Sequence, residues 1–275
     1  MILPPFSSPE GFKSAIHPPS EHIAEVCWLI FSQNQLLVSQ DRKRLPTQSE
    51  CELQRTLYLG SLNNKHFFAG EAKIETPNLP GWIWNPIRPL HTTLNPADYA
   101  IAGRAMQLLY WDRSNQYCGH CGKATFSRKH ERCRECKSCG QLAYPKMSMA
   151  VLALVRRGQQ ILLARSPQFP EPFFSTLAGF VDPGETFEQC VIREVLEEVH
   201  IKVKNVQYFG SQPWPLSHSI MIGFFCEWEE GEIQIDPNEI AEASWFGISN
   251  LPRLPPLYSL ARFLIDGFIQ TQGNH

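Results

Sequence analysis

The chain has 275 residues, more than one small domain needs and enough for two or three domains with ordinary hydrophobic cores. Hydrophobic residues make up 43% and charged residues 19%, a composition that excludes a disordered chain and is typical of a folded globular protein. The formal net charge of -2 and the pI near 6.5 exclude a global positive field, so any contact with RNA must be local.

The sequence also bears on the compartment. The first twenty residues carry prolines where a signal peptide needs an apolar run, and no apolar stretch reaches membrane-spanning length. Five of the nine cysteines crowd into one short segment, a spacing that suits metal binding better than disulfides. These features predict a cytoplasmic protein without a membrane anchor. The other cysteines are expected to be small buried hydrophobic residues: Cys27, Cys51, Cys190 and Cys226.

Residues 1–112 are predicted to form a small α/β domain. Apolar runs up to Trp84 alternate with polar turns, as the strands of a modest sheet do. Asn95 followed by Pro96 is typical of a helix N-cap and first helical position, and this helix is predicted to end near Asp112. No catalytic motif is found in this part of the chain, so its role is not predicted.

A cysteine-rich segment, residues 113–145, follows the first domain. Two CxxC pairs lie fourteen residues apart, as expected for a structural zinc site with four thiolate ligands, here Cys118, Cys121, Cys136 and Cys139. Cys133 forms a competing CxxC with Cys136, but each preferred pair is followed by a glycine. Free thiols, a redox pair, or a ligand from His120 or His130 are the alternatives. Zinc held by four thiolates has no open position for water, so it is predicted to stabilise the fold only.

The same segment carries a local group of basic residues in a nearly neutral chain. Such a group is able to contact RNA phosphates, although a solvated loop surface is the more common explanation. Its members are Lys123, Arg128, Lys129, Arg132, Arg134 and Lys137.

Residues 146–275 are predicted to form a third domain, in which residues 179–201 are a glycine-containing loop that opens into a helix. By helical spacing, the residues expected to pack on a sheet are Ile192, Val195, Leu196 and Val199. Glu194, Glu197 and Glu198 are expected to converge on the other side. Carboxylates so close together are costly unless cations lie between them, which predicts a site for Mg²⁺ or Mn²⁺.

Residues 179–201 resemble the Nudix box, G-x5-E-x7-R-E-U-x-E-E-x-G-U, where U is a bulky apolar residue. The six matching positions are Gly179, Glu185, Arg193, Glu194, Glu197 and Glu198. His200 replaces the final glycine of the box, which affects the turn at the helix end more than the chemistry. The resemblance implies an α/β/α sandwich with a mixed sheet, and metal-dependent hydrolysis of a pyrophosphate linkage. A solvated acidic helix is the alternative, but it explains neither the glycines nor Arg193.

A second motif narrows the resemblance to one branch of the family. Residues 211–219, SQPWPLSHS, are similar to the SQPWPFPxS signature of NADH pyrophosphatases and NAD-capped RNA hydrolases. Leu216 and Ser217 replace the usual Phe-Pro, which puts the exact shape of this loop in doubt. A small N-terminal domain, a four-cysteine ribbon and a Nudix domain, in that order, are the arrangement of this branch. The branch is typically dimeric, so the resemblance implies a homodimer.

The resemblance also implies roles for individual residues. Those that would hold the catalytic metal ions are Ala178, through its carbonyl, Glu194, Glu198 and Glu239. Glu198 is expected to be the essential carboxylate, and either Glu197 or Glu198 would accept a proton from the attacking water. Those that would hold loop and helix in register are Gly179, Glu185 and Arg193. The implied substrate contacts are Arg88, Glu131, Tyr144, Phe180, Gln212, Pro213, Trp214, Pro215, Ser219 and Ala261.

Some of these assignments have alternatives. Core packing explains Phe180 as well as a ligand contact does, whereas Trp214, between two prolines, is harder to explain as core. Glu131 belongs to the ribbon and Ala261 to the last helix, so a pocket shared between two subunits is expected.

The predicted reaction is hydrolysis of NADH or NAD⁺ to a nicotinamide mononucleotide and AMP. NAD-capped RNA would give the mononucleotide and RNA with a 5′-monophosphate. A hydrolase of ADP-ribose or dinucleoside polyphosphates is the alternative if Leu216 and Ser217 alter the nicotinamide pocket. A zinc-ribbon RNA-binding protein with an inactive Nudix domain is the alternative outside the enzymes, although all the metal-binding carboxylates are present.

Overall fold

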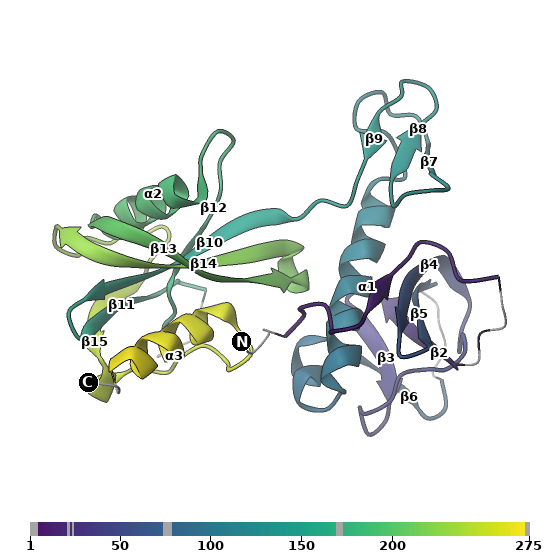
Figure 1. Cartoon of the computed structure of the whole chain (residues 1–275), viewed down its shortest axis with the longest axis horizontal. Helices are drawn as coiled ribbons and strands as arrows, with labels where there is room; N and C mark the ends of the chain where they lie inside the picture. Colours follow the sequence, from purple (N-terminus) through teal and green to yellow (C-terminus); the bar gives the residue numbers. More distant parts are fainter. Residues whose placement is uncertain (1–4, 21–22, 24, 74–78, 169–172, 273–275) are drawn as a thin grey trace. The chain divides into compact units, whose positions relative to one another are not determined.

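The computed structural model describes residues 5–20, 23, 25–73, 79–168 and 173–272. These residues form two compact units, one built from residues 148–214 with 219–272 and the other from residues 5–147 with 215–218, within the described ranges. Each unit contains its own six-stranded sheet (Figure 1). Within the described ranges, no helix is both long and apolar enough to cross a bilayer.

The predicted N-terminal sheet is confirmed. Its strands lie in the order β1–β4–β5–β2–β3–β6; β2 and β5 are parallel, and the other neighbouring pairs are antiparallel. In chain order the strands are β1 (Lys13–Ser14), β2 (Glu25–Ser32), β3 (Gln35–Ser39), β4 (Leu53–Leu62), β5 (Lys65–Ala72) and β6 (Trp82–Pro86). Cys27 is buried in this sheet, but Cys51, which was expected to be buried, is only half-buried because it lies in the loop that leads into β4.

Helix α1 (Pro96–Ser114) follows a short 3₁₀ turn, η1 (Arg88–Thr92), and packs against β5, β4 and β2. The predicted start is confirmed, because the Asn95 side chain accepts a hydrogen bond of 2.9 Å from the backbone N–H of Ala97. The helix continues two residues beyond Asp112. After it, the ribbon forms a small antiparallel sheet of β7 (Thr125–Ser127), β8 (Arg134–Cys136) and β9 (Leu142–Ala143).

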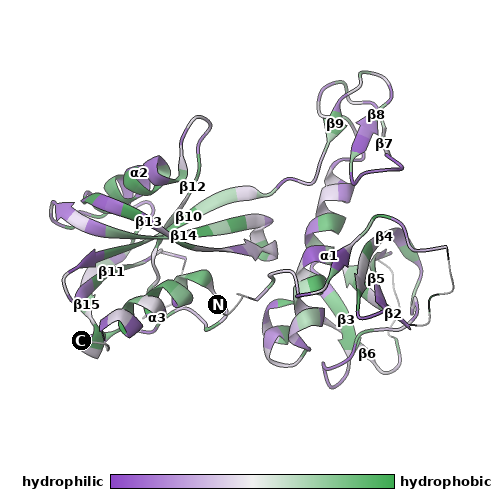
Figure 2. Cartoon of the chain, in the orientation of Figure 1, coloured by the Kyte–Doolittle hydropathy of each residue, from purple (hydrophilic) through white to green (hydrophobic). Residues whose placement is uncertain are grey.

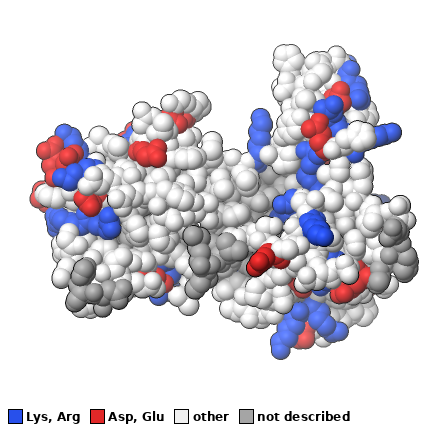
Figure 3. All heavy atoms as spheres, viewed as in Figure 1, with Lys and Arg blue, Asp and Glu red and all other residues white. Residues whose placement is uncertain are grey.

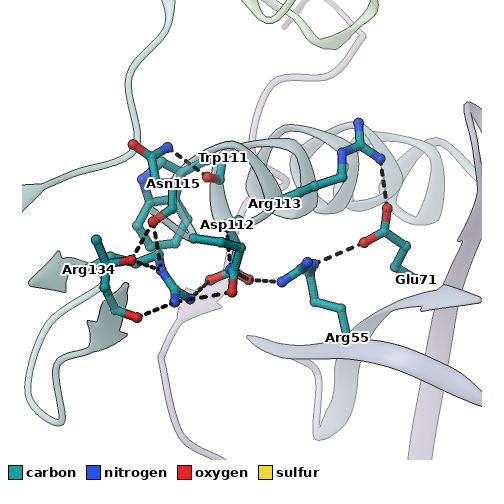
Figure 4. A network of polar contacts seen from close by, with 9 residues as sticks. Arg55, Glu71, Trp111, Asp112, Arg113, Asn115 and Arg134 are labelled. Atoms are coloured by element: carbon teal, nitrogen blue, oxygen red, sulfur yellow. Dashed lines mark hydrogen bonds and ion pairs between the residues drawn. The ribbon is translucent and has the colours of Figure 1, made fainter. Parts of the chain in front are cut away.

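Asp112 is the centre of a buried polar network near the end of α1 (Figure 4). Its carboxylate pairs with Arg55 of β4 at 2.5 Å and with Arg134 of β8 at 2.7 Å. Arg55 also pairs with Glu71 of β5 at 2.9 Å, and Glu71 pairs with Arg113 at 2.7 Å. Removal of one member would leave a buried charge without its partner, so these pairs fix the ribbon, the helix and the sheet together.

The second sheet is mixed, as the resemblance implied. Its strands lie in the order β13–β14–β10–β11–β15, and β12 also pairs with β10. β10 and β14 are parallel, and the other pairs are antiparallel. The strands are β10 (Ser148–Arg157), β11 (Gln160–Arg165), β12 (Leu177–Phe180), β13 (Lys202–Trp214), β14 (Ser219–Glu230) and β15 (Glu242–Gly247). Two 3₁₀ turns complete the connections, η2 (Pro215–Ser217) and η3 (Ile248–Asn250).

Two helices cover opposite faces of this sheet, which confirms the α/β/α sandwich (Figure 1). Side chains of β10 point alternately to the two faces. Val151 and Val155 pack with α2 (Phe187–Val199), whereas Leu152 and Leu154 pack with α3 (Leu260–Gln272). Both faces of β10 are therefore apolar, which explains the continuous hydrophobic run of this strand (Figure 2).

The orientation of α2 differs from the prediction. Ile192 and Leu196, which were expected to pack on the sheet, are 43% and 42% exposed. Val195 and Val199 are buried against the sheet as expected. Val191 completes the buried apolar stripe in place of Ile192 and Leu196, so the buried face is displaced toward Val191. As a result Glu194 and Glu198 lie beside the apolar stripe and are buried, and only Glu197 of the three carboxylates is exposed.

Candidate functional site

Three carboxylates meet at one side of α2. Glu194 and Glu198 come from the helix, and Glu239 comes from the loop before β15. Each offers an oxygen atom, and these three oxygens all lie within 4.8 Å of one another. The loop is held against the helix because the backbone N–H of Asp236 donates to the carbonyl of Glu198 at 3.0 Å. A chain segment some forty residues after the helix therefore completes the cluster.

The electrostatics of this cluster favour a bound cation. Burial, followed by the charges of Glu194, Glu239 and Glu197, raises the pKa of Glu198 to about 8. Burial is also the main cause of the raised pKa of Glu194. The Oε2 atom of Glu198 is buried and has no hydrogen-bond partner among the described residues. Several carboxylate oxygens close together are the ligand set that hard divalent cations prefer, so these residues fit such an ion.

Gly179 is required for the position of Glu194. A Cβ atom on Gly179 of β12 would lie 1.8 Å from the carboxyl carbon of Glu194 and 2.0 Å from its Oε1. The Glu194 carboxylate therefore occupies the space that any other residue would fill with its own side chain. Ala178, the predicted carbonyl ligand, directly precedes this glycine in β12.

Arg193 connects the box loop to the helix. Its guanidinium pairs with both oxygens of Glu185, at 2.5 and 2.8 Å, and donates to the Phe180 carbonyl at 3.0 Å. One nitrogen also donates to Glu194 and Glu197, each at 2.9 Å. The two-point contact between the Arg193 guanidinium and the Glu185 carboxylate lowers the pKa of Glu185 to about 2. The contacts are those expected of residues that hold the loop and the helix in register.

The loop and the end of the helix are also well defined. The helix begins after Thr186, which forms a reciprocal capping box with Gln189, so Glu185 lies in the loop before the helix. His200, in place of the box glycine, adopts the left-handed conformation with φ of 58°. Its Nδ1 is 2.8 Å from the carbonyl of Gln234, a contact that glycine cannot make. The turn of the Nudix box is therefore kept despite the substitution.

The predicted substrate contacts divide into groups. Glu131 and Tyr144 lie together, with the tyrosine hydroxyl donating to the carboxylate at 3.1 Å. Tyr144 also lines a cavity of about 460 Å³ with Tyr110 and Trp111, residues that the sequence did not single out. In the other unit, Phe180 is 56% exposed at the end of β12.

Two residues of the motif at 211–219, Gln212 and Trp214, contact the segment that leads into α3. Trp214 and Pro213 are half-buried, and the Trp214 ring stacks on Tyr258 with ring centroids 6.1 Å apart. Gln212 is fully buried; its amide donates to the Tyr258 carbonyl at 2.8 Å and accepts from the Leu260 N–H at 2.7 Å. This geometry joins β13 to the start of α3.

For three other predicted contacts, the structure also favours packing. Pro215, Ser219 and Ala261 are buried, and Ala261 belongs to the hydrophobic core between α3 and the sheet. Substrate contacts of these residues and of Gln212 stay a prediction. Arg88, at the start of η1, is exposed.

The ribbon brings its four predicted cysteines together. The Sγ atoms of Cys118 and Cys139 are 3.6 Å apart, and those of Cys121 and Cys136 are 3.5 Å apart. These distances are close to the edge of a tetrahedron with Zn–S bonds of about 2.3 Å and far from the S–S bond of about 2.0 Å in a disulfide. Cys133 is buried outside this cluster, and its Sγ faces the carbonyl of Arg134.

The two halves of the zinc site have the same backbone turn. The N–H groups of Gly122 and Gly140 donate to the carbonyls of Cys118 and Cys136, at 2.8 and 2.9 Å. Both glycines have positive φ, 71° and 78°, which explains why a glycine follows each pair. The preferred pairing of the cysteines is therefore confirmed, and the residues fit structural zinc.

Three of the six residues of the predicted basic surface of the ribbon, Arg128, Arg134 and Lys137, are paired with neighbouring acidic groups. Arg134 was expected on the surface, but it is buried and paired with Asp112. Arg128 pairs with Glu131, and Lys137 pairs with Glu135 at 3.1 Å. Figure 3 shows acidic and basic side chains side by side on this part of the surface. The cluster as a whole is therefore a weak candidate for binding phosphates.

Comparison with known families assigns all three parts of the chain. Residues 146–265 match the NUDIX domain, and residues 113–144 match the NADH pyrophosphatase zinc ribbon domain. Residues 25–111 match the NADH pyrophosphatase-like rudimentary NUDIX domain. The sequence predicted a sheet and a helix in residues 25–111, but it did not show that this region is related to a Nudix domain, because it carries no catalytic motif.

Several curated proteins are similar to the chain. The NAD-capped RNA hydrolase NudC of Pseudomonas fluorescens is 44% identical over 200 residues, which are 73% of this chain and 72% of the relative. The NudC of Chromobacterium violaceum is 42% identical over 240 residues, 86% of this chain and 89% of the relative. A solved Nudix hydrolase from Nitrosomonas europaea is 18% identical with a TM-score of 0.49, and the match covers 58% of this chain and 93% of that one. The chain therefore belongs to the Nudix hydrolase family, in its zinc-ribbon branch of NADH pyrophosphatases and NAD-capped RNA hydrolases.

Proposed function

We propose that the protein hydrolyses the pyrophosphate bond of NAD(H), giving a nicotinamide mononucleotide and AMP. We further propose that it removes the NAD cap of RNA, which leaves RNA with a 5′-monophosphate. The observation that carries this proposal is the cluster of Glu194, Glu198 and Glu239 in a chain whose curated relatives are NAD-capped RNA hydrolases. An inactive Nudix domain does not account for the buried Glu198, whose Oε2 has no hydrogen-bond partner among the described residues.

In the proposed mechanism, Glu194, Glu198 and Glu239, with the carbonyl of Ala178, hold divalent cations. When bound, Mg²⁺ or Mn²⁺ would supply charge neutralisation of the pyrophosphate and a lower pKa for the attacking water. Arg193 keeps the Phe180 carbonyl and Glu185 in place, so that β12 stays beside α2. The buried free oxygen of Glu198 is available to bind a cation or to accept a proton, and Glu197 is the other candidate for the base.

Several aromatic and polar residues are proposed to take part in substrate binding. Tyr144 and Phe180 present exposed aromatic rings, which are suited to a flat nicotinamide or adenine. Glu131 orients the Tyr144 hydroxyl. Gln212 acts as a positioning residue, since both ends of its amide are used to hold the start of α3.

Gly179→Ala is expected to disrupt the carboxylate cluster, because the new methyl group would displace the Glu194 carboxylate. We expect turnover to fall roughly 10- to 100-fold, with a stability loss of no more than about 1–3 kcal/mol, because the clashing group is the end of a flexible side chain. Steady-state kinetics and urea unfolding measure the two effects. Gly247→Ala is the matched control, since a Cβ there meets nothing within 4 Å. Equal activity of the two variants would contradict the proposed position of Glu194.

The substrate assignment is tested by a competition among NADH, NAD-capped RNA and ADP-ribose in one manganese-containing reaction, followed by mass spectrometry. The ratios of kcat/KM report the preference directly. We expect both NAD-containing substrates to be cleaved in preference to ADP-ribose. A preference for ADP-ribose would show that Leu216 and Ser217 have changed the specificity, and cleavage of none would overturn the proposal.

We also propose that the protein is a cytoplasmic homodimer. The dimer is implied by the branch to which the chain belongs, and light scattering of the purified protein measures it. A reducing compartment is consistent with a zinc site made of thiolates and with cysteines that form no disulfide within the described residues.

A further inference from the structure

A second cavity in the N-terminal unit is lined by basic groups. It encloses about 500 Å³ between the segment after β1, helix α1, the ribbon and the residues that follow β9. Arg104 of α1 and Arg132 of the ribbon lie inside it, and His130 and Lys146 are exposed at its edge. A cavity of this size lies within the usual range of ligand sites, about 300–1,000 Å³.

These cations lack acidic partners in the part of the chain that the structure describes. Within the described ranges, no carboxylate forms an ion pair with Arg104, Arg132 or Lys146, although Arg55 and Arg134 of the same unit are both paired. Burial, together with the charge of Arg104, lowers the pKa of Arg132 to about 10. Burial lowers the pKa of Arg104 as well. Two guanidinium groups close together in a partly buried place repel each other, and the ring of Phe12, 5.6 Å from Arg104, is a weaker partner than an anion. An anion bound to both guanidinium groups would therefore offset a cost that no carboxylate among the described residues offsets.

The two arginines are also held in place. Arg104 donates from Nη2 to the Ser14 hydroxyl at 2.7 Å, and its Nε is buried without an acceptor in the described part of the chain. Arg132 donates from Nη2 to the carbonyls of Ala15 and Tyr58, at 2.7 and 2.9 Å. A purely structural role accounts for the hydrogen bonds of the two Nη2 atoms. It does not explain why Arg104, whose Nε has no acceptor among the described residues, lies beside Arg132.

We propose that this cavity binds a phosphate group, and that the phosphate is a phosphodiester of the RNA chain that follows the NAD cap. Guanidinium forks match phosphate oxygens well, and none of the proposed catalytic residues belongs to the cavity. Lys146 lines this cavity and also the cavity of Tyr110, Trp111 and Tyr144. Cationic groups next to aromatic rings are typical of sites for single-stranded RNA, which favours RNA over free phosphate. The assignment to RNA rests on the proposed function.

The test measures binding of a short fluorescent RNA with a 5′-monophosphate to the zinc-loaded full chain, without added divalent cations. The variant is Arg104→Gln/Lys146→Gln, which keeps the contacts of Arg132 to the backbone. We expect Kd to rise about tenfold or more, and the slope of log Kd against log salt to become shallower by about 1. Lys43→Gln/Lys123→Gln, which removes two exposed cations outside the cavity, is expected to change Kd less than about twofold.

Several outcomes would overturn the proposal. RNA binding by the double variant equal to that of the wild type, with zinc content and melting temperature unchanged, would do so. If inorganic phosphate raised the melting temperature of the wild type alone while RNA binding stayed equal, the site would take free phosphate and not RNA. A changed molecular mass of the variant in light scattering would assign the cavity to a subunit contact. Because uncapped RNA is used and no turnover is measured, failure of the proposed NAD hydrolysis would leave this test intact.

Discussion

Glu198→Gln is expected to abolish hydrolysis of both NADH and NAD-capped RNA. Glutamine has nearly the same shape but no charge, and the buried Oε2 that is free in the described structure becomes part of a neutral amide. We expect kcat to fall roughly 10²- to 10⁴-fold, the range for loss of a group that acts directly in proton transfer or charge stabilisation. Steady-state assays with each substrate, at saturating Mn²⁺, measure this effect.

The same substitution should not weaken the fold. Burial, and after it the charges of Glu194 and Glu239, disfavour the ionised form of Glu198 in the fold, so a neutral residue there is expected to raise the unfolding midpoint in a metal-chelating buffer. Added Mn²⁺ should then stabilise the wild type and have little effect on the variant. Glu188→Gln, at an exposed position in the first turn of the same helix, is the matched control and should retain activity. Near-normal turnover of Glu198→Gln would contradict the proposed metal site.

Cys136→Ala is expected to remove the zinc and unfold the ribbon. Structural zinc contributes an apparent free energy of about 10–16 kcal/mol in zinc-finger peptides, so the loss of one ligand has a large effect on so small a sheet. Cys136 and Arg134 lie two residues apart in β8. Unfolding of β8 therefore also withdraws Arg134, one of the two cationic partners of buried Asp112, at a further cost of up to about 3–5 kcal/mol to the N-terminal unit.

Zinc content by elemental analysis and thermal unfolding by circular dichroism measure these effects. The matched control is Cys133→Ala, because Cys133 is buried but outside the cluster of four sulfur atoms. It is expected to keep one zinc per chain. Loss of zinc from Cys133→Ala as well as from Cys136→Ala would show that the competing CxxC, Cys133 with Cys136, supplies the ligands.

Features that depend on near neighbours were predictable from the sequence. The Asn95 cap, the two cysteine pairs with their glycines, and the succession of strands each depend on interactions over a few residues. The box motif placed Glu194 and Glu198 on one helix for the same reason. Its glycine is explained only by the structure, because the carboxylate that fills its vacant side-chain space lies fifteen residues further along the chain.

The buried face of α2 was predictable from periodicity only in part, because Val195 and Val199 are buried but Ile192 and Leu196 are exposed. Two neighbouring stripes of the helix are both apolar, and they differ by one position, so the pattern alone favours neither strongly. Contacts of Val191, Val195 and Val199 with the sheet select the stripe that is buried. The same selection brings Glu194 and Glu198 inward to meet Glu239, a residue that only the fold of the later chain places there.

The pairing of charged side chains was the feature least predictable from the sequence. Arg134, Arg104 and Arg132 carry the same charge, but the first is neutralised by Asp112 and the other two are left without acidic partners in the described structure. The sequence by itself determined the family, the zinc ligands and the helix that carries the box, because local spacing is enough for each. Only the tertiary structure decided which carboxylates are buried and which cations are unpaired, because the energy of a charge depends on neighbours brought close by the fold.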